Sequence, residues 1–99
     1  MHRQPNRYFV YILSNPGKMI YTGVTSDLHR RVWQHRFESN SAHTLKYGIH
    51  QLVWFEETDD VTAAIAKEKQ LKTWRRQWKL HLVEFENPHW LDLAGDWYG

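Results

Sequence analysis

Two apolar segments near the N-terminus have the composition of β-strands. Residues 8–13 are mostly aromatic or β-branched without polar alternation, which is typical of a strand buried on both faces. The sequence Asn-Pro-Gly-Lys at residues 15–18 breaks this strand, and residues 19–25 have strand character again. We therefore predict an antiparallel hairpin in which Gly17 supplies the positive φ of the turn.

The length of this turn decides which side chains share a face of the hairpin. With an odd number of turn residues, 15–17, Tyr11 falls opposite Tyr21 and both rings emerge on one face. A change of one residue would separate them. The sequence therefore predicts that the two tyrosines are neighbours.

A helix is predicted from residue 28 to about residue 38, because Ser26 or Asp27 can cap its first amides. At 3.6 residues per turn, one stripe of this helix carries two apolar and two polar side chains: Leu28, Arg31, Val32 and His35. The two polar members are therefore expected to face inward. Arg30 lies off the stripe and points elsewhere.

Residues 49–56 predict a third strand after a loop over residues 39–48. Thr58, Asp59 or Asp60 can then cap a second helix. One stripe of that helix holds four apolar residues and one acid: Val61, Ala64, Ile65, Glu68 and Leu71. Because an unpaired carboxylate is costly on an apolar stripe, Glu68 is predicted to have a partner.

The last third of the chain predicts one more helical segment and a tail. A break is expected near Thr73, after which a helical stripe continues in Trp74, Trp78, Leu82 and Phe85. Asn87 precedes a proline and ends the helix. Residues 89–99 are expected to form an aromatic tail that docks on the domain.

Composition limits the class of protein. A chain of 99 residues with 41% apolar residues can build one core, so we predict a single domain over residues 1–99 with its core at about 7–88. Without cysteine, any metal must be held by carboxylate, imidazole or water. The longest apolar run, 8–13, is far shorter than the roughly 20 residues of a membrane span, and no signal-peptide pattern is present. A cytoplasmic protein that does not enter membranes is expected.

Five short segments stand in a fixed order along the chain: Phe9-Val10-Tyr11, Tyr21-Thr22-Gly23, 25–31, 66–76 and Asn87-Pro88. Together they resemble the GIY-YIG endonuclease superfamily, and especially its small one-domain bacterial members of the URI type. The resemblance implies an α/β (α+β) domain, in which helices flank a three-stranded antiparallel sheet in the order β-β-α-β-α-α. It also implies an endonuclease that depends on a divalent metal and hydrolyses phosphodiester bonds in DNA.

The resemblance assigns roles to five catalytic candidates. By position, Tyr11 matches the tyrosine that activates the attacking water, and Tyr21 matches the tyrosine beside it. Arg31 matches the family's arginine, and His35 stands four residues later. Glu68 matches the glutamate that binds the metal, here Mg²⁺ or Mn²⁺.

These residue types suit phosphodiester hydrolysis. One Mg²⁺ bound through a single carboxylate such as Glu68 can polarise the phosphate, and the planar, permanently charged Arg31 can hold two phosphate oxygens. Tyrosine titrates near pH 10, so Tyr11 acts as a base only if a cation favours its phenolate or if it relays a proton. His35 is the competing base, since imidazole titrates near neutrality. Some relatives have a lysine at the position of Val24 and a tyrosine at that of His35, which leaves the proton route open.

The charge distribution favours a nucleic-acid partner more than the net charge of +2 does. Residues 67–79 hold six basic residues and one acid, a pattern typical of either a solvated helix face or a phosphate-binding surface. The residues predicted to contact nucleic acid are Arg30, Lys67, Lys72, Arg75, Arg76 and, by its place in the family pattern, Asn87. Because the domain is too small for a separate reading module, a protein partner is expected to supply specificity.

Each candidate also has a purely structural interpretation. Tyr11 and Tyr21 can be ordinary sheet aromatics. Glu68 can pair with Lys72 at i+4, and Arg31 can bind a backbone carbonyl or a carboxylate. At the level of function, the alternatives are a nucleic-acid-binding module without catalysis and a protein-interaction domain that uses the aromatic tail.

Overall fold

The computed structural model describes residues 6–38 and 46–98. Its elements follow the predicted order: β1 (Tyr8–Ser14), β2 (Ile20–Thr25), α1 (Leu28–Phe37), β3 (Gln51–Thr58), α3 (Val61–Thr73) and α4 (Arg76–Glu86). Residues 39–45 of the predicted loop lie outside the described residues. None of the helices in the described part is long and apolar enough to cross a membrane.

The three strands form one antiparallel sheet in the order β2-β1-β3. Strand β1 is central, and its residues from Val10 to Ser14 are buried, which confirms the prediction of a strand covered on both faces. Strand β3 begins two residues later than predicted. Strand β2 lies at the edge of the sheet, so side chains from the two faces of the sheet can approach each other past its outer side.

The hairpin register differs from the prediction by two residues. Tyr11 pairs with Gly23, and Tyr21 pairs with Leu13, so the two tyrosines are not directly opposite. The turn spans residues 15–19, where Asn15 Oδ1 accepts a hydrogen bond from the Met19 amide at 2.9 Å. This turn also has an odd number of residues, so the rings still share a face, as predicted.

The positive φ of the turn does not fall on Gly17. Lys18 adopts it instead, with φ of 64°. The longer turn moves the left-handed position one residue along the chain. The Lys18 carbonyl is held in place because it accepts a hydrogen bond from the Arg76 guanidinium.

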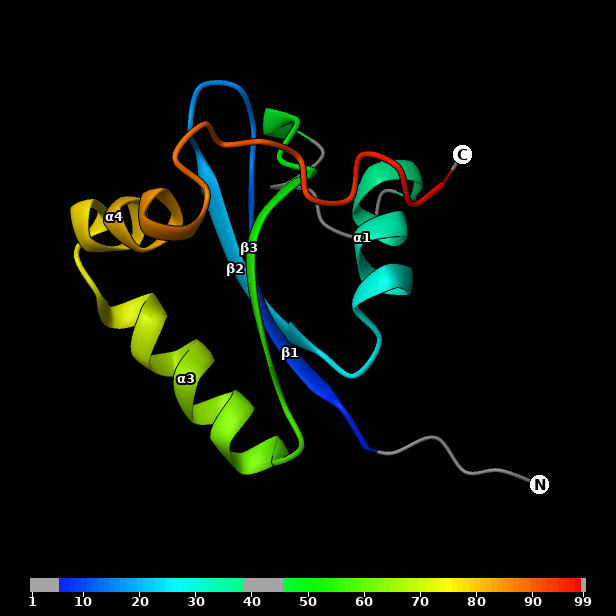
Figure 1. Ribbon diagram of the computed structural model, residues 1–99, viewed down its shortest axis with the longest axis vertical. Helices are drawn as coiled ribbons and strands as arrows, with labels where there is room; N and C mark the ends of the chain where they lie inside the picture. The colour runs from blue at the N-terminus through cyan, green and yellow to red at the C-terminus, as the bar shows by residue number, and fades with distance from the viewer. Residues whose placement is uncertain (1–5, 39–45, 99) are drawn as a thin grey trace.

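Helices cover both faces of the sheet (Figure 1). Helices α3 and α4 pack on one face, over a core that includes Val10, Ile12, Val53, Trp54, Ala64, Leu71 and Val83. Helix α1 and the C-terminal tail cover the other face, over Tyr11, Leu13, Leu28, Val32, Ile49, Leu52 and Ala94. Asp27 caps α1, and Asp60 caps α3, each within the range predicted for its helix.

The predicted stripes of the later helices are wrong in part. Val61 and Ile65 of α3 are 43% and 41% exposed, because this helix packs through a narrower line that passes through Ala64 and Leu71. The predicted break after Thr73 is present, and it resets the phase of the next helix. Helix α4 buries Val83, whereas Trp78 and Phe85, which belong to the predicted stripe, are 54% and 88% exposed.

The C-terminal tail docks on the domain, as predicted. Asp92 Oδ2 pairs with Arg36 of α1 at 2.6 Å, and Asp92 Oδ1 accepts from the amides of Leu52 and Ala94, both at 3.1 Å. The Leu93 amide donates to the Leu52 carbonyl at 2.7 Å. The tail thus joins α1 to the edge of β3 and fixes the helix that carries Arg31 and His35.

Candidate active site

The Tyr11 ring lies across the backbone of the edge strand. Tyr11 is 1% exposed, and its cross-strand partner is Gly23. A Cβ atom at Gly23 would stand 2.5 Å from both Cζ and Oη of Tyr11, a separation that real contacts do not allow. Only glycine at this position lets the Tyr11 hydroxyl reach beyond β2.

Three rings from β1, β2 and α1 meet on this face of the sheet. The ring centroids of Tyr11 and Tyr21 are 6.3 Å apart, and that of His35 is 6.0 Å from Tyr11 and 5.1 Å from Tyr21. Tyr11 Oη and His35 Nε2 form a buried hydrogen bond of 3.1 Å. The inward stripe of α1 is confirmed, since Val32 and His35 are buried, Arg31 is half-buried and Arg30 is exposed.

The surroundings keep both members of this hydrogen bond uncharged near neutral pH. Burial raises the pKa of Tyr11 above its usual value, and the nearby Tyr21 adds to the shift, while Arg31 opposes it. Burial, together with the positive charge of Arg31, lowers the pKa of His35 to about 4. The neutral imidazole can therefore accept a hydrogen bond from the Tyr11 hydroxyl when its own proton is on Nδ1.

Glu68 approaches the same site from the other face of the sheet. It lies on α3, which packs beside β2, and its negative charge contributes to the raised pKa of Tyr11. Its side chain is only 14% exposed. Its Oε2 is 2.8 Å from Nζ of Lys72, so the i,i+4 ion pair of the purely structural interpretation is present.

The donor set fits one hard divalent cation. Within residues 6–38 and 46–98, no three His, Asp or Glu side chains gather around a common point. Glu68 is a carboxylate that is partly withdrawn from solvent and close enough to Tyr11 to influence its hydroxyl electrostatically. Mg²⁺ is commonly held by one or two carboxylates with water completing its shell, so this arrangement fits such an ion.

A polar cleft of about 330 Å³ adjoins the site at the start of α1, and Arg30 and Arg31 line it together with Thr25, Ser26, Asp27 and Gln34. Sequence reasoning did not single out Thr25, Ser26 or Gln34 as possible site residues. It also assigned no role to Gly23 beyond its place in the motif. An isolated glycine within a strand is the signal that could have indicated a close approach of another group.

The other predicted nucleic-acid contacts lie on α3, α4 and the segment between them. Lys67 is near Glu56 and the Trp74 ring, and Arg75 is near the Trp78 ring, with its guanidinium carbon 5.9 Å from the ring centroid. Arg76 holds the hairpin turn, as described above. These basic residues therefore border the α3 face, at the side opposite to α1 (Figure 1).

Asn87 has a structural function. It is 5% exposed, and its Nδ2 donates to the carbonyls of Val53 at 3.1 Å and Leu91 at 2.9 Å. Its Oδ1 accepts from the Leu91 amide at 3.0 Å. Both amide hydrogens are therefore used to join the end of α4 to β3 and the tail, and the side chain cannot donate to a phosphate in this arrangement.

Comparison with known proteins places this geometry in a family. Residues 7–81 match the model of the GIY-YIG catalytic domain. A UPF0213 protein of Haloquadratum walsbyi is 35% identical over 77 residues, which cover 78% of this chain and 86% of the relative. A UPF0213 protein of Staphylococcus saprophyticus is 30% identical over 78 residues, which cover 79% of this chain and 95% of that protein.

A solved structure agrees with this assignment. The solution NMR structure of a UPF0213 protein from Bacillus halodurans superposes with a TM-score of 0.57 at 25% identity, covering 91% of this chain and 97% of the other. The fold predicted from the sequence is therefore confirmed. Since the family match also spans most of the chain and includes both tyrosines, Arg31 and Glu68, the protein belongs to the GIY-YIG family.

Proposed function

We propose that this protein is an endonuclease that hydrolyses phosphodiester bonds in DNA with the help of one divalent metal ion. The observation that carries the proposal is the meeting of Tyr11, His35 and the charge of Arg31 at a glycine in the edge strand, with Glu68 approaching from the other face. A buried phenol and imidazole beside a guanidinium are poorly explained by packing alone. The phenol and the imidazole suit a reaction in which a proton is transferred, and the guanidinium suits the binding of a phosphate beside them.

Arg31 is proposed to hold the scissile phosphate. It lines a polar cleft at the start of α1, and its positive charge also acts on Tyr11. Its guanidinium offers a planar fork of donors that stays charged at all relevant pH values. In this position it would also neutralise negative charge that grows on the phosphate during attack. Arg30, in the same cleft, would contact a neighbouring phosphate.

Tyr11 and His35 are proposed to act together as a proton relay. A Tyr11 phenolate is not available in the free protein, because the pKa of Tyr11 is raised, whereas neutral His35 can accept its proton. A phosphate bound at Arg31 would offset the positive charge that depresses the pKa of His35, so substrate binding itself would strengthen the imidazole as a base. The attacking water would then pass a proton to Tyr11 as Tyr11 passes its own to His35.

Glu68 is proposed to hold Mg²⁺ or Mn²⁺. When bound, such an ion supplies charge neutralisation at the phosphate and a coordinated water that can protonate the leaving oxygen. Lys72 already pairs with Glu68 and would have to share or release the carboxylate. Any neutralisation of Glu68 also removes one of the influences that raise the pKa of Tyr11.

The remaining assignments follow from this reaction. Lys67, Arg75 and Arg76 would contact the backbone of the nucleic acid on the α3 side of the site, where phosphate contacts supply affinity without sequence specificity. A protein partner would then add specificity. The expected place of action is the cytoplasm.

A cleavage assay tests the proposal. Supercoiled, linear, branched and single-stranded DNA, together with RNA, would be incubated with Mg²⁺ or Mn²⁺ and with wild type, Glu68→Ala or Arg31→Ala protein. Glu86→Ala, an exposed acid at the end of α4, is the matched control. We expect cleavage of DNA that is lost in both site variants and kept in the control, and equal cleavage by Glu68→Ala and wild type would reject the proposal.

A second candidate function is a nucleic-acid-binding module that does not cut. Two observations favour it: Glu68 is already paired with Lys72, and Val24, which stands where some relatives have a lysine, packs against the apolar core beneath α3. In this case, the same assay would show binding to nucleic acid with no turnover of any substrate. Affinity that falls steeply with salt would identify the phosphate contacts.

A further inference from the structure

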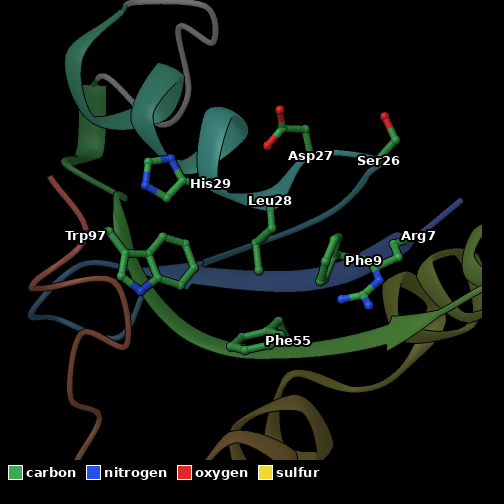
Figure 2. Close-up of a pocket in the computed structure, with 8 residues that line it drawn as sticks. All are labelled: Arg7, Phe9, Ser26, Asp27, Leu28, His29, Phe55 and Trp97. Atoms are coloured by element: carbon green, nitrogen blue, oxygen red, sulfur yellow. The ribbon is translucent and has the colours of Figure 1, made fainter. Parts of the chain in front are cut away.

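A second pocket, of about 480 Å³, lies on the α1 face of the sheet and is not used by the proposed reaction. Figure 2 shows Phe9 of β1 and Phe55 of β3 at its base, beneath the start of α1. These two rings meet edge to face, with centroids 6.4 Å apart. Because Phe9 stands two residues before Tyr11 in the same strand, it faces the same side of the sheet, and the pocket adjoins the candidate active site.

The C-terminal tail supplies one wall of this pocket. Trp97 stacks on His29 of α1, with ring centroids 5.4 Å apart and an angle of 10° between the planes. Tyr98 Oη donates to the His29 carbonyl at 2.6 Å and holds the tail against the helix. Trp97 lies beyond residues 7–81, the part that matches the family, so this wall is a feature of the chain's own tail.

The lining combines aromatic faces with a polar rim. Phe9, Phe55 and Trp97 surround the space, and Phe55 is 37% exposed, so its ring is accessible from solvent. Figure 2 shows Ser26, Asp27 and Arg7 at the rim, with the Arg7 guanidinium beside Phe9 and the side-chain oxygens of Ser26 and Asp27 pointing away from the rings. Arg7 also lies 3.6 Å from Glu57, and Asp27 Oδ1 accepts a hydrogen bond from the Arg30 amide, so Arg7 is the charged group that lies nearest to the aromatic space. A planar ring with hydrogen-bonding edges suits such a site, and the volume falls in the range of about 300–1,000 Å³ usual for small-ligand pockets.

The two pockets lie side by side at the start of α1 and share two lining residues. Ser26 and Asp27 line both this pocket and the polar cleft that contains Arg30 and Arg31. A nucleotide chain with a phosphate on Arg31 can therefore pass over the start of α1 and place a ring in the aromatic pocket. We propose that the pocket binds one unpaired nucleobase next to the phosphate held by Arg31; the nature of the ligand rests on the proposed function.

An abasic scan tests this inference without requiring turnover. Binding of single-stranded oligonucleotides, each lacking the base at one position, would be measured by fluorescence anisotropy with Glu68→Ala protein, so that no substrate is cut. One abasic position should raise the Kd about 5- to 150-fold, which corresponds to the 1–3 kcal/mol contributed by stacking of one base on an aromatic ring. Adding Phe55→Ala should remove this sensitivity.

Two further variants separate stacking from folding. Phe55→Leu keeps an apolar side chain without an aromatic face and should lose the sensitivity as well. Phe85→Ala removes a ring that is 88% exposed on α4, outside the pocket, and should retain it. Thermal unfolding of each variant would confirm that the fold is intact.

The outcomes distinguish this inference from the proposed nuclease function. The inference is overturned if wild-type protein cuts DNA but no abasic position changes the Kd, if the sensitivity survives both Phe55 variants, or if single strands do not bind. Sensitivity that depends on Phe55 in a protein that cuts no substrate would support the pocket and reject the nuclease.

Discussion

Substitution of Gly23 by alanine should disable the site with only moderate loss of stability. The added Cβ would stand 2.5 Å from Tyr11 Oη and Cζ, whereas ordinary contacts begin near 3.4 Å, so the ring or the strand must shift by about 1 Å. The hydrogen bond from Tyr11 to His35, now 3.1 Å, would exceed the limit of about 3.5 Å after such a shift. We expect a cleavage rate about 100-fold lower, and a free energy of unfolding lower by about 1–3 kcal/mol.

Gly17→Ala is the matched control for this prediction. The nearest atom to a Cβ at Gly17 is 3.5 Å away, and its φ is not positive, so the change should alter stability by less than about 1 kcal/mol and leave cleavage unchanged. Single-turnover rates and urea unfolding would be measured for both variants. In a Tyr11→Phe background, Gly23→Ala should add little further loss of rate, because the hydroxyl is already absent. A wild-type cleavage rate for Gly23→Ala, or equal losses of cleavage rate in both glycine variants, would show that the contact between Gly23 and Tyr11 does not control the site.

Three further predictions concern charge. The pKa of His35 is about 4 in the folded state and 6.5 in the unfolded state, so the unfolded state binds more protons as the pH falls below 6.5. The free energy of unfolding, measured with urea, should therefore fall by about 2 kcal/mol between pH 7 and pH 5. The His35→Gln variant should not show this loss. Asp92→Ala removes an ion pair and two amide contacts and should lower the free energy of unfolding by about 2–3 kcal/mol, whereas the exposed Asp96→Ala should change it by less than about 0.5 kcal/mol. Lys72→Ala frees Glu68 and should lower the Mg²⁺ concentration for half-maximal cleavage about twofold at saturating DNA, since an i,i+4 ion pair on a helix contributes only about 0.3–0.5 kcal/mol. A higher requirement for Mg²⁺ would mean that Lys72 orients the carboxylate.

The parts of the fold that were predicted correctly depend on local sequence. Successive side chains of a strand point to opposite faces, so any turn with an odd number of residues places Tyr11 and Tyr21 on one face of the sheet. The error of two residues in the predicted register therefore did not change which face the two rings share. The 3.6-residue period turns Arg31 and His35 toward the sheet because α1 is a single uninterrupted helix. The packing of α1 on the face that carries Tyr11 then brings Tyr11 and His35, 24 residues apart, within hydrogen-bonding distance.

The parts that were missed depend on tertiary contacts. The predicted stripe of α4 contains Trp78 and Phe85, which are both exposed, because the face of α4 that packs on the sheet is set by the turn of the chain before it. The ion pair between Asp92 and Arg36 joins residues 56 positions apart, and no periodic pattern in the sequence indicates it. The aromatic pocket near Phe9 depends on where this tail docks, so no local sequence pattern indicates it.

Glu68 is proposed to belong to a hydrolytic site with Tyr11 and Arg31. The most direct test is the single-turnover rate of DNA cleavage by Glu68→Gln, which keeps the size of the side chain and removes its charge, beside Glu86→Gln as control. We predict a rate at least 100-fold lower for Glu68→Gln at any Mg²⁺ concentration, with DNA affinity within about twofold of wild type. Cleavage by Glu68→Gln at the rate of wild type and of Glu86→Gln would contradict the account.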